Sequence, residues 1–313
     1  MKRRFILLIL LLPMMNVAAA KQTQFAYTQA QGTHDFSYQW RVNDRTFQLD
    51  FSIPNEQFNT MPATRPAFSN DIMQRHVQVA LLKMAQEYDV KEARINIFRR
   101  SGTLQYTVKS TDEAMAQKTL DALQNKANVA KQQYLDEQFY TPYVSPMNEQ
   151  AVKHDHAKYA QQSTAGLKTV IDAIKEMQVN PADSREFIAI SLSWLQSIPY
   201  DTLENRISSN GAGFVSPKDL LQQNKGDCDS KATLLAALLR AYSSSVRQKM
   251  VLLPKHALLA VAVRPKPNDK VVTENGIEYV LLEAAGPGYF DIGEVADSTL
   301  MGIRNRQFIL ETM

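Results

Sequence analysis

The stretch Lys225–Ala232, KGDCDSKA, contains Cys228, the only cysteine in this chain of 313 residues. Apolar residues recur at helical spacing after it, so the sequence predicts that a buried helix begins beside Cys228. The free N–H groups at a helix N-terminus favour the thiolate, which is the nucleophilic form of cysteine. The two flanking aspartates oppose that effect, so a nucleophilic Cys228 needs a base. A lone cysteine by itself fits a buried thiol equally well.

The candidate base is His256, which opens a strand-like apolar run at 257–263. Glu283 lies near the end of the next such run, at 277–284, and a buried acid is rare unless it is paired. If the two strands are antiparallel neighbours, His256 can face Glu283, and the carboxylate can fix the tautomer of the imidazole. Gln196, near the end of an earlier predicted helix, is a candidate oxyanion donor, and it equally fits a surface glutamine. Cysteine, histidine and acid in this arrangement favour nucleophilic catalysis.

These segments resemble the bacterial transglutaminase-like proteins. The resemblance covers about residues 184–295 and rests on Lys225–Ala232, Pro254–Ala257, Tyr279–Glu283 and the lead-in helix segment Leu195–Tyr200. It implies a papain-like α+β core with a helical lead-in, a cysteine at a helix N-terminus and an antiparallel sheet. By that resemblance Cys228 is the nucleophile, His256 the base and Glu283 the orienting acid. Glu283 stands where the family often has aspartate, and Leu258 stands where it often has an aromatic residue.

The first twenty residues have the layout of a secretory signal peptide. A basic segment at residues 2–4 precedes the apolar run Phe5–Met15, and three alanines at 18–20 form a small-residue cleavage site. Eleven apolar residues are too few to span a bilayer, so we expect cleavage after Ala20 and a periplasmic or secreted protein without a stable membrane span. An uncleaved anchor is the alternative. Without these residues the 35 basic side chains become 32, which equals the 32 acidic ones, and a nucleic-acid binder is not expected.

The rest of the chain divides into three predicted parts. Residues 21–137 read as a small ββαββα domain, because two alternating hairpins are each followed by a helical pattern. Residues 138–160 read as a linker. Its His154-x-His156 spacing could hold a metal, but a solvated linker fits the surrounding sequence better. Residues 161–313 read as the transglutaminase-like domain, and neither a metal nor an organic cofactor is expected.

The sequence therefore predicts an exported α+β enzyme that carries out cysteine-dependent acyl transfer at an amide bond of a protein or peptide. Hydrolysis by a peptidase or amidase and transfer to an amine by a transglutaminase both remain open, as does the oligomeric state. The alternative is a non-catalytic module of the same fold that binds a peptide or an envelope protein. A redox-sensing thiol is a further alternative, and it would need no contact with Glu283.

Overall fold

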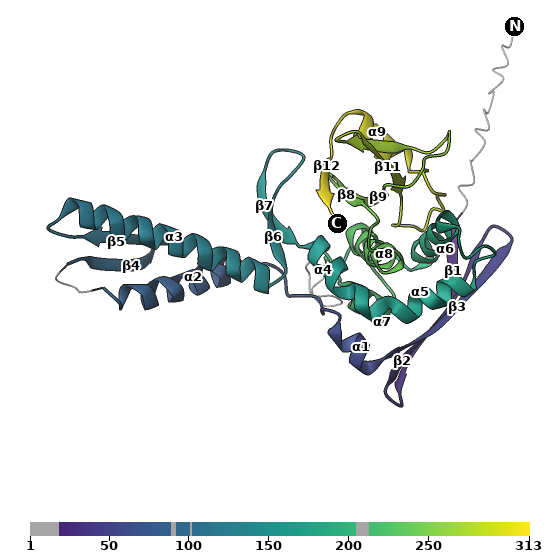
Figure 1. Cartoon of the computed structure of the whole chain (residues 1–313), viewed down its shortest axis with the longest axis horizontal. Helices are drawn as coiled ribbons and strands as arrows, with labels where there is room; N and C mark the ends of the chain where they lie inside the picture. The colour runs from purple at the N-terminus through teal and green to yellow at the C-terminus, as the bar shows by residue number, and fades with distance from the viewer. Residues whose placement is uncertain (1–18, 89–91, 101, 205–212) are drawn as a thin grey trace, which may run out of the picture.

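The protein is a mixed α+β structure in a computed structural model that describes residues 19–88, 92–100, 102–204 and 213–313. The expected signal peptide lies outside these residues, apart from Ala19 and Ala20. Figure 1 shows a main body from which a long lobe projects. Within the described ranges, no helix is long and apolar enough to cross a membrane.

The main body contains two antiparallel sheets with helices between them (Figure 1). The first sheet has the order β1-β2-β3, from strands Ala20–Ala30, Thr33–Val42 and Arg45–Pro54. The second has the order β10-β11-β9-β8-β12, from strands Val271–Glu274, Ile277–Leu282, His256–Val261, Gln248–Leu253 and Ile309–Thr312. The helices of the body are α1 (Asn55–Thr60), α4 (His156–Ser163), η1 (Thr164–Leu167), α5 (Lys168–Glu176), α6 (Ser184–Ser197), α7 (Pro217–Gln223), α8 (Cys228–Tyr242) and α9 (Asp297–Arg304).

The first sheet shares its core with the second half of the chain. Trp40 and Trp194 are fully buried in one hydrophobic cluster that also contains apolar residues of α8. The Trp40 indole N–H donates a hydrogen bond of 3.2 Å to Ser193 Oγ, and the Tyr38 and Trp194 rings lie 5.1 Å apart, edge to face. The expected unit at 21–137 is therefore divided, because the alternating apolar face of β2 and β3 packs against α1, α5 and α6 rather than against the helices at 70–85 and 113–137.

The remaining elements of that segment form the projecting lobe: α2 (Asn70–Ala85), β4 (Arg94–Arg100), β5 (Thr103–Lys109) and α3 (Glu113–Glu137). Val77, Leu81 and Leu123 are buried in a separate cluster between the helices and the β4–β5 hairpin. Ser69 caps α2. The cap of α3 is Asp112, whose carboxylate accepts from the N–H groups of residues 114 and 115.

The expected linker at 138–160 is ordered structure. It forms the hairpin of β6 (Tyr140–Val144) and β7 (Gln150–His154) and the first turn of α4. His154 and His156 are both buried, because His154 stacks on Phe214 and His156 contacts Asp229. In the part of the chain that the structure describes, no group of three or more His, Cys, Asp or Glu side chains could hold a metal.

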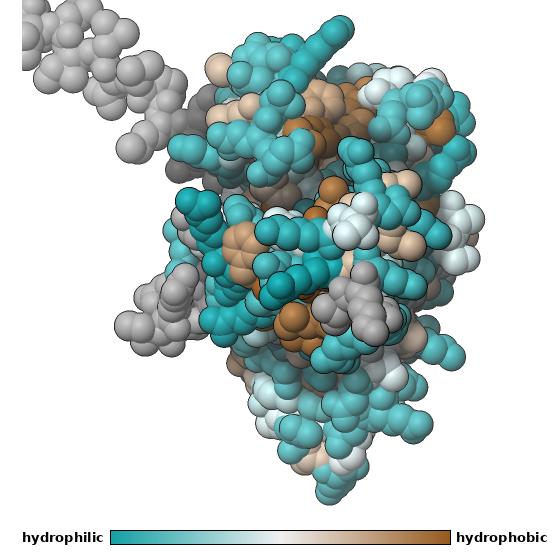
Figure 2. Space-filling view, turned by 90° about the vertical axis from the view of Figure 1, so that its left-hand side faces the viewer, coloured by the Kyte–Doolittle hydropathy of each residue, from teal (hydrophilic) through white to brown (hydrophobic). Residues whose placement is uncertain are grey.

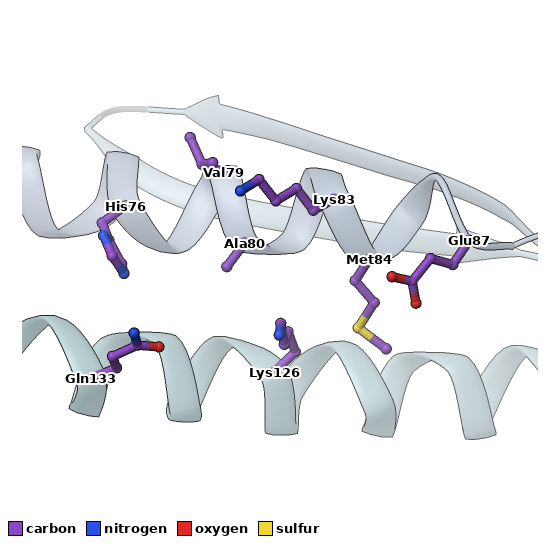
Figure 3. A pocket seen from close by; sticks show the side chains of 8 residues that line it. All are labelled: His76, Val79, Ala80, Lys83, Met84, Glu87, Lys126 and Gln133. Carbon is purple, nitrogen blue, oxygen red and sulfur yellow. The ribbon is translucent and has the colours of Figure 1, made fainter.

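A groove of about 570 Å³ runs between the two lobe helices. In Figure 3, His76 and Met84 of α2 point towards α3, and Lys126 of α3 points back towards α2. Figure 2 looks at the molecule from the side on which the lobe projects, and that face is mostly hydrophilic with separate apolar patches. The groove is lined by none of the residues around Cys228.

Candidate active site

The N-terminus of α8 places Cys228. Asp227 is the N-cap, and its carboxylate accepts a hydrogen bond of 3.2 Å from the backbone N–H of Ser230. Gly226 precedes the cap in a tight space, since a Cβ there would lie 2.9 Å from the side chain of Leu220. Cys228 is the first residue of α8, so its sulfur lies at the positive end of the helix dipole. The residue is half-buried.

His256 and Glu283 come together as the sequence predicts. Strands β9 and β11 are antiparallel neighbours, with Leu259 opposite Leu282. His256 Nε2 lies 2.8 Å from Glu283 Oε1 and 2.9 Å from Oε2. Glu283 is only 2% exposed, and Thr299 Oγ1 donates a further bond of 3.3 Å to Oε2. The carboxylate is therefore buried with two donors.

The imidazole of His256 joins the thiol to this carboxylate. Burial acts to lower the pKa of His256, but hydrogen bonds to Cys228 and Glu283 and their negative charges outweigh it and raise the pKa to about 10. Glu283 occupies Nε2, so Nδ1 is the ring atom left for the Cys228 sulfur. A histidine held by a buried acid beside a cysteine is the arrangement that activates a cysteine nucleophile.

Gln196 does not face Cys228 as an oxyanion donor. Its side chain is fully buried, and its amide nitrogen donates to the carbonyl oxygens of Glu283 at 2.7 Å and Phe290 at 2.9 Å. Both amide hydrogens are thus committed to backbone carbonyls. Gln196 instead fixes the segment that follows β11, and through it the position of Glu283. The expected oxyanion role is corrected to a structural one.

Tyr200 is a site residue to which the sequence assigned no role. It pairs with Gly226, two residues before Cys228, and its hydroxyl interacts with Cys228. Burial, together with the negative charge of Cys228, raises the pKa of Tyr200 to about 12, so the phenol keeps its proton at neutral pH. The residue is 46% exposed overall. The signal was present in the lead-in segment, but an aromatic residue after a helix does not by itself indicate chemistry.

Lys231 is a second residue that sequence reasoning missed. It is fully buried one turn after Cys228, and its ammonium donates to the carbonyl oxygens of Ile198 and Ala285, each at 2.5 Å. Burial lowers the pKa of Lys231 to about 7, although its electrostatic interactions with Asp227 and Cys228 act in the other direction. The side chain joins the segment that carries Tyr200 to the segment that follows Glu283.

The two aspartates beside Cys228 do not both act as negative charges. Burial and the charge of Asp229 raise the pKa of Asp227 to about 11, so Asp227 is protonated and hydrogen-bonds to Asp229. Burial acts to raise the pKa of Asp229, but hydrogen bonds from His156 and Asp227 lower it overall. His156 Nε2 lies 3.0 Å from Asp229 Oδ2. Of the two negative charges that the sequence suggests, only that of Asp229 remains, and it is hydrogen-bonded to His156.

Comparison of the chain with protein-family models, with curated proteins and with solved structures found no match. The chemistry that this site can perform depends on Cys228, His256, Glu283 and Tyr200 and on the groups that hold them in place.

Proposed function

We propose that the protein is an exported cysteine-dependent enzyme that transfers an acyl group from an amide bond of a protein or peptide. One observation carries the proposal. His256 is hydrogen-bonded to both carboxylate oxygens of the buried Glu283 and interacts with Cys228. The packing of α8 against an antiparallel sheet that supplies the histidine and the acid supports a papain-like transglutaminase core.

The reaction follows from the positions of the protons. The Cys228 thiolate attacks the amide carbonyl and forms a tetrahedral intermediate while His256 holds the proton. His256 then gives this proton to the leaving nitrogen, the C–N bond breaks, and a thioester remains on Cys228. Glu283 stabilises the imidazolium throughout, because its two oxygens accept from Nε2. Water or an amine then releases the acyl group, with His256 acting as base.

The substrate class follows from the access to the site. Cys228 is half-buried and Tyr200 is exposed beside it, so an acyl donor has to present its carbonyl at the surface. This suits a flexible segment of a protein or peptide. The basic, apolar and small-residue layout at residues 1–20 supports export to the periplasm or the medium.

The test measures acylation of Cys228 in the full chain. The protein is mixed with p-nitrophenyl acetate, and the thioester on Cys228 is detected by mass spectrometry, with methylamine and water as competing acceptors. We expect His256→Ala to slow acylation at pH 7 by about 10²-fold or more, the size typical of general-base catalysis. His76→Ala, a matched histidine change in the lobe, should leave the rate unchanged.

A second arm uses amide substrates, because an activated ester is less demanding than an amide. Unfolded casein with methylamine should yield either shorter fragments or methylamine-labelled glutamine in wild type, and neither product in Cys228→Ser. If Cys228 is not acylated by the ester, or if His256→Ala acylates as fast as wild type, the enzyme proposal fails. The fold would then be a module that binds a peptide or an envelope protein.

A further inference from the structure

We propose that the Tyr200 hydroxyl donates the hydrogen bond that stabilises the oxyanion formed during acyl transfer at Cys228. This inference rests on the proposed function and adds a catalytic residue to it. It starts from the pairing of Tyr200 with Gly226, two residues before Cys228, which places the phenol beside the thiol with which its hydroxyl interacts. In the tetrahedral intermediate the oxyanion is two bonds from the sulfur, so a donor that reaches the sulfur also reaches that oxygen.

The backbone holds Tyr200 in register with the nucleophile. A single parallel bridge pairs Tyr200 with Gly226, two residues before Cys228. Gly226 N donates to Pro199 O at 3.3 Å, and Asp201 N donates to Gly226 O at 3.2 Å. The residues on both sides of Tyr200 are therefore bonded to the segment that leads into α8. Such preorganisation is what an oxyanion donor needs, because it then does not have to reorient during the reaction.

The side chain of Tyr200 is held by a buried cation. The Lys231 ammonium lies 6.0 Å from the centre of the Tyr200 ring, within the range of a cation–π interaction. The same ammonium bonds to the carbonyl oxygen of Ile198, two residues before Tyr200. Lys231 thus fixes the segment that carries Tyr200 and contacts its ring, while the hydroxyl end points to Cys228.

The other candidate donors have different tasks. Both amide hydrogens of Gln196 are committed to carbonyl oxygens of the segment after β11. His256 has to give its proton to the leaving nitrogen, so it cannot also serve the oxyanion. His256 and Tyr200 are two residues whose side chains interact with Cys228. Of these two side chains, Tyr200 is the one available to the oxygen, beside the backbone N–H of Cys228 at the start of α8.

The sulfur of Cys228 forms a bond to the carbonyl carbon, and the π electrons of the C=O bond move to the oxygen, which accepts a hydrogen bond from the Tyr200 hydroxyl. The phenol keeps its proton. When the C=O bond re-forms, the C–N bond breaks and the nitrogen leaves with the proton from His256.

Two electrophiles separate this role from simple positioning of the thiol. Iodoacetamide alkylates the sulfur without forming an oxyanion, whereas p-nitrophenyl acetate acylates it through one. For Tyr200→Phe both rates are measured against pH and compared at their high-pH plateaus, where the thiol is ionised in every variant. We expect the plateau rate of acylation to fall by about 10²-fold, as when an oxyanion-hole donor is removed, and that of alkylation to change by less than about twofold.

The phenylalanine keeps the ring over Lys231, so the variant should fold, and circular dichroism checks this. Tyr143→Phe, which changes an accessible tyrosine of β6, serves as the matched control and should alter neither rate. An equal fall in both rates would overturn the proposal and make Tyr200 a positioning residue, and no fall in acylation would also overturn it. If wild type is alkylated but never acylated, the proposed function fails, and the oxyanion assignment fails with it.

Discussion

Replacing Glu283 by glutamine tests the electrostatic link between His256 and its acid. The pKa of His256 is raised from 6.5 to about 10 despite burial, a difference of about three and a half pKa units. At about 1.4 kcal/mol per unit, the surroundings favour the imidazolium by about 5 kcal/mol. Cys228 and Glu283 are the sources of this effect. In Glu283→Gln the ring keeps a hydrogen-bond acceptor of the same shape but loses one of the two charges, so we expect the pKa of His256 to fall by about 2 units.

The assay is NMR titration of the His256 ring protons in wild type and in Glu283→Gln. Direct titration is preferable to measuring the free energy of unfolding against pH. A histidine whose pKa is raised contributes stability that is complete below pH 6.5 and is lost as the pH rises through about 10. Lys231, whose pKa is lowered to about 7 from 10.5, makes the protein more stable as the pH rises across nearly the same interval. The two contributions therefore oppose each other in the measured free energy of unfolding.

The matched control is Glu278→Gln, which removes a carboxylate from the exposed end of the same strand and should leave the titration of His256 unchanged. Cys228→Ala removes the other source of the effect and should also lower the midpoint. A wild-type His256 that titrates near pH 6.5, or an unchanged midpoint in Glu283→Gln, would refute the reasoning that the pair is coupled.

Three further predictions concern stability, each measured by urea unfolding at pH 7. Lys231→Met keeps the alkyl chain but leaves two buried carbonyl groups without their donor, so it should cost about 1–3 kcal/mol. Gly286→Ala should destabilise severely, because Gly286 has φ +62° and a Cβ there would lie 2.0 Å from the Gln196 carbonyl oxygen. Gly276→Ala is its control, since φ is +76° but nothing lies within 4 Å, so only the strain of about 1–2 kcal/mol applies. Trp40→Ala should cost about 3–5 kcal/mol, and a loss below about 1 kcal/mol would contradict the shared core.

The local elements were predictable where the pattern was short and regular. The hairpin of β2 and β3 follows from alternation, and the start of α8 at Cys228 follows from the helical spacing of the apolar residues after it. Strands β10 and β12 were missed because each is only four residues long. The pairing of the first sheet with α6 was also missed, because an apolar face predicts burial without saying against which partner.

The contact between His256 and Glu283 was predictable because antiparallel pairing brings the start of one strand to the end of the next. The groups that surround each side chain could not be predicted from the sequence. Gln196 is an amide at the end of a helix near Cys228, as an oxyanion donor would be. Its two amide hydrogens are instead donated to the backbone carbonyl groups of Glu283 and Phe290, which are far away in the sequence. Lys231 reads as a solvent-exposed helical lysine until the structure shows carbonyl groups around it.

The division of the chain between body and lobe has a consequence for its evolution and engineering. The polypeptide chain leaves the body after α1 and returns to it at β6. There the Tyr140 hydroxyl donates a hydrogen bond to the carbonyl oxygen of Pro66. The lobe is thus an insertion whose two ends meet, inside a discontinuous domain that folds from both sides of it. Such a segment can be lengthened, exchanged or excised with a short connection in its place, while β1–β3 cannot be removed without exposing Trp194. The lobe is the part of this protein whose alteration leaves the core around Trp194 in place.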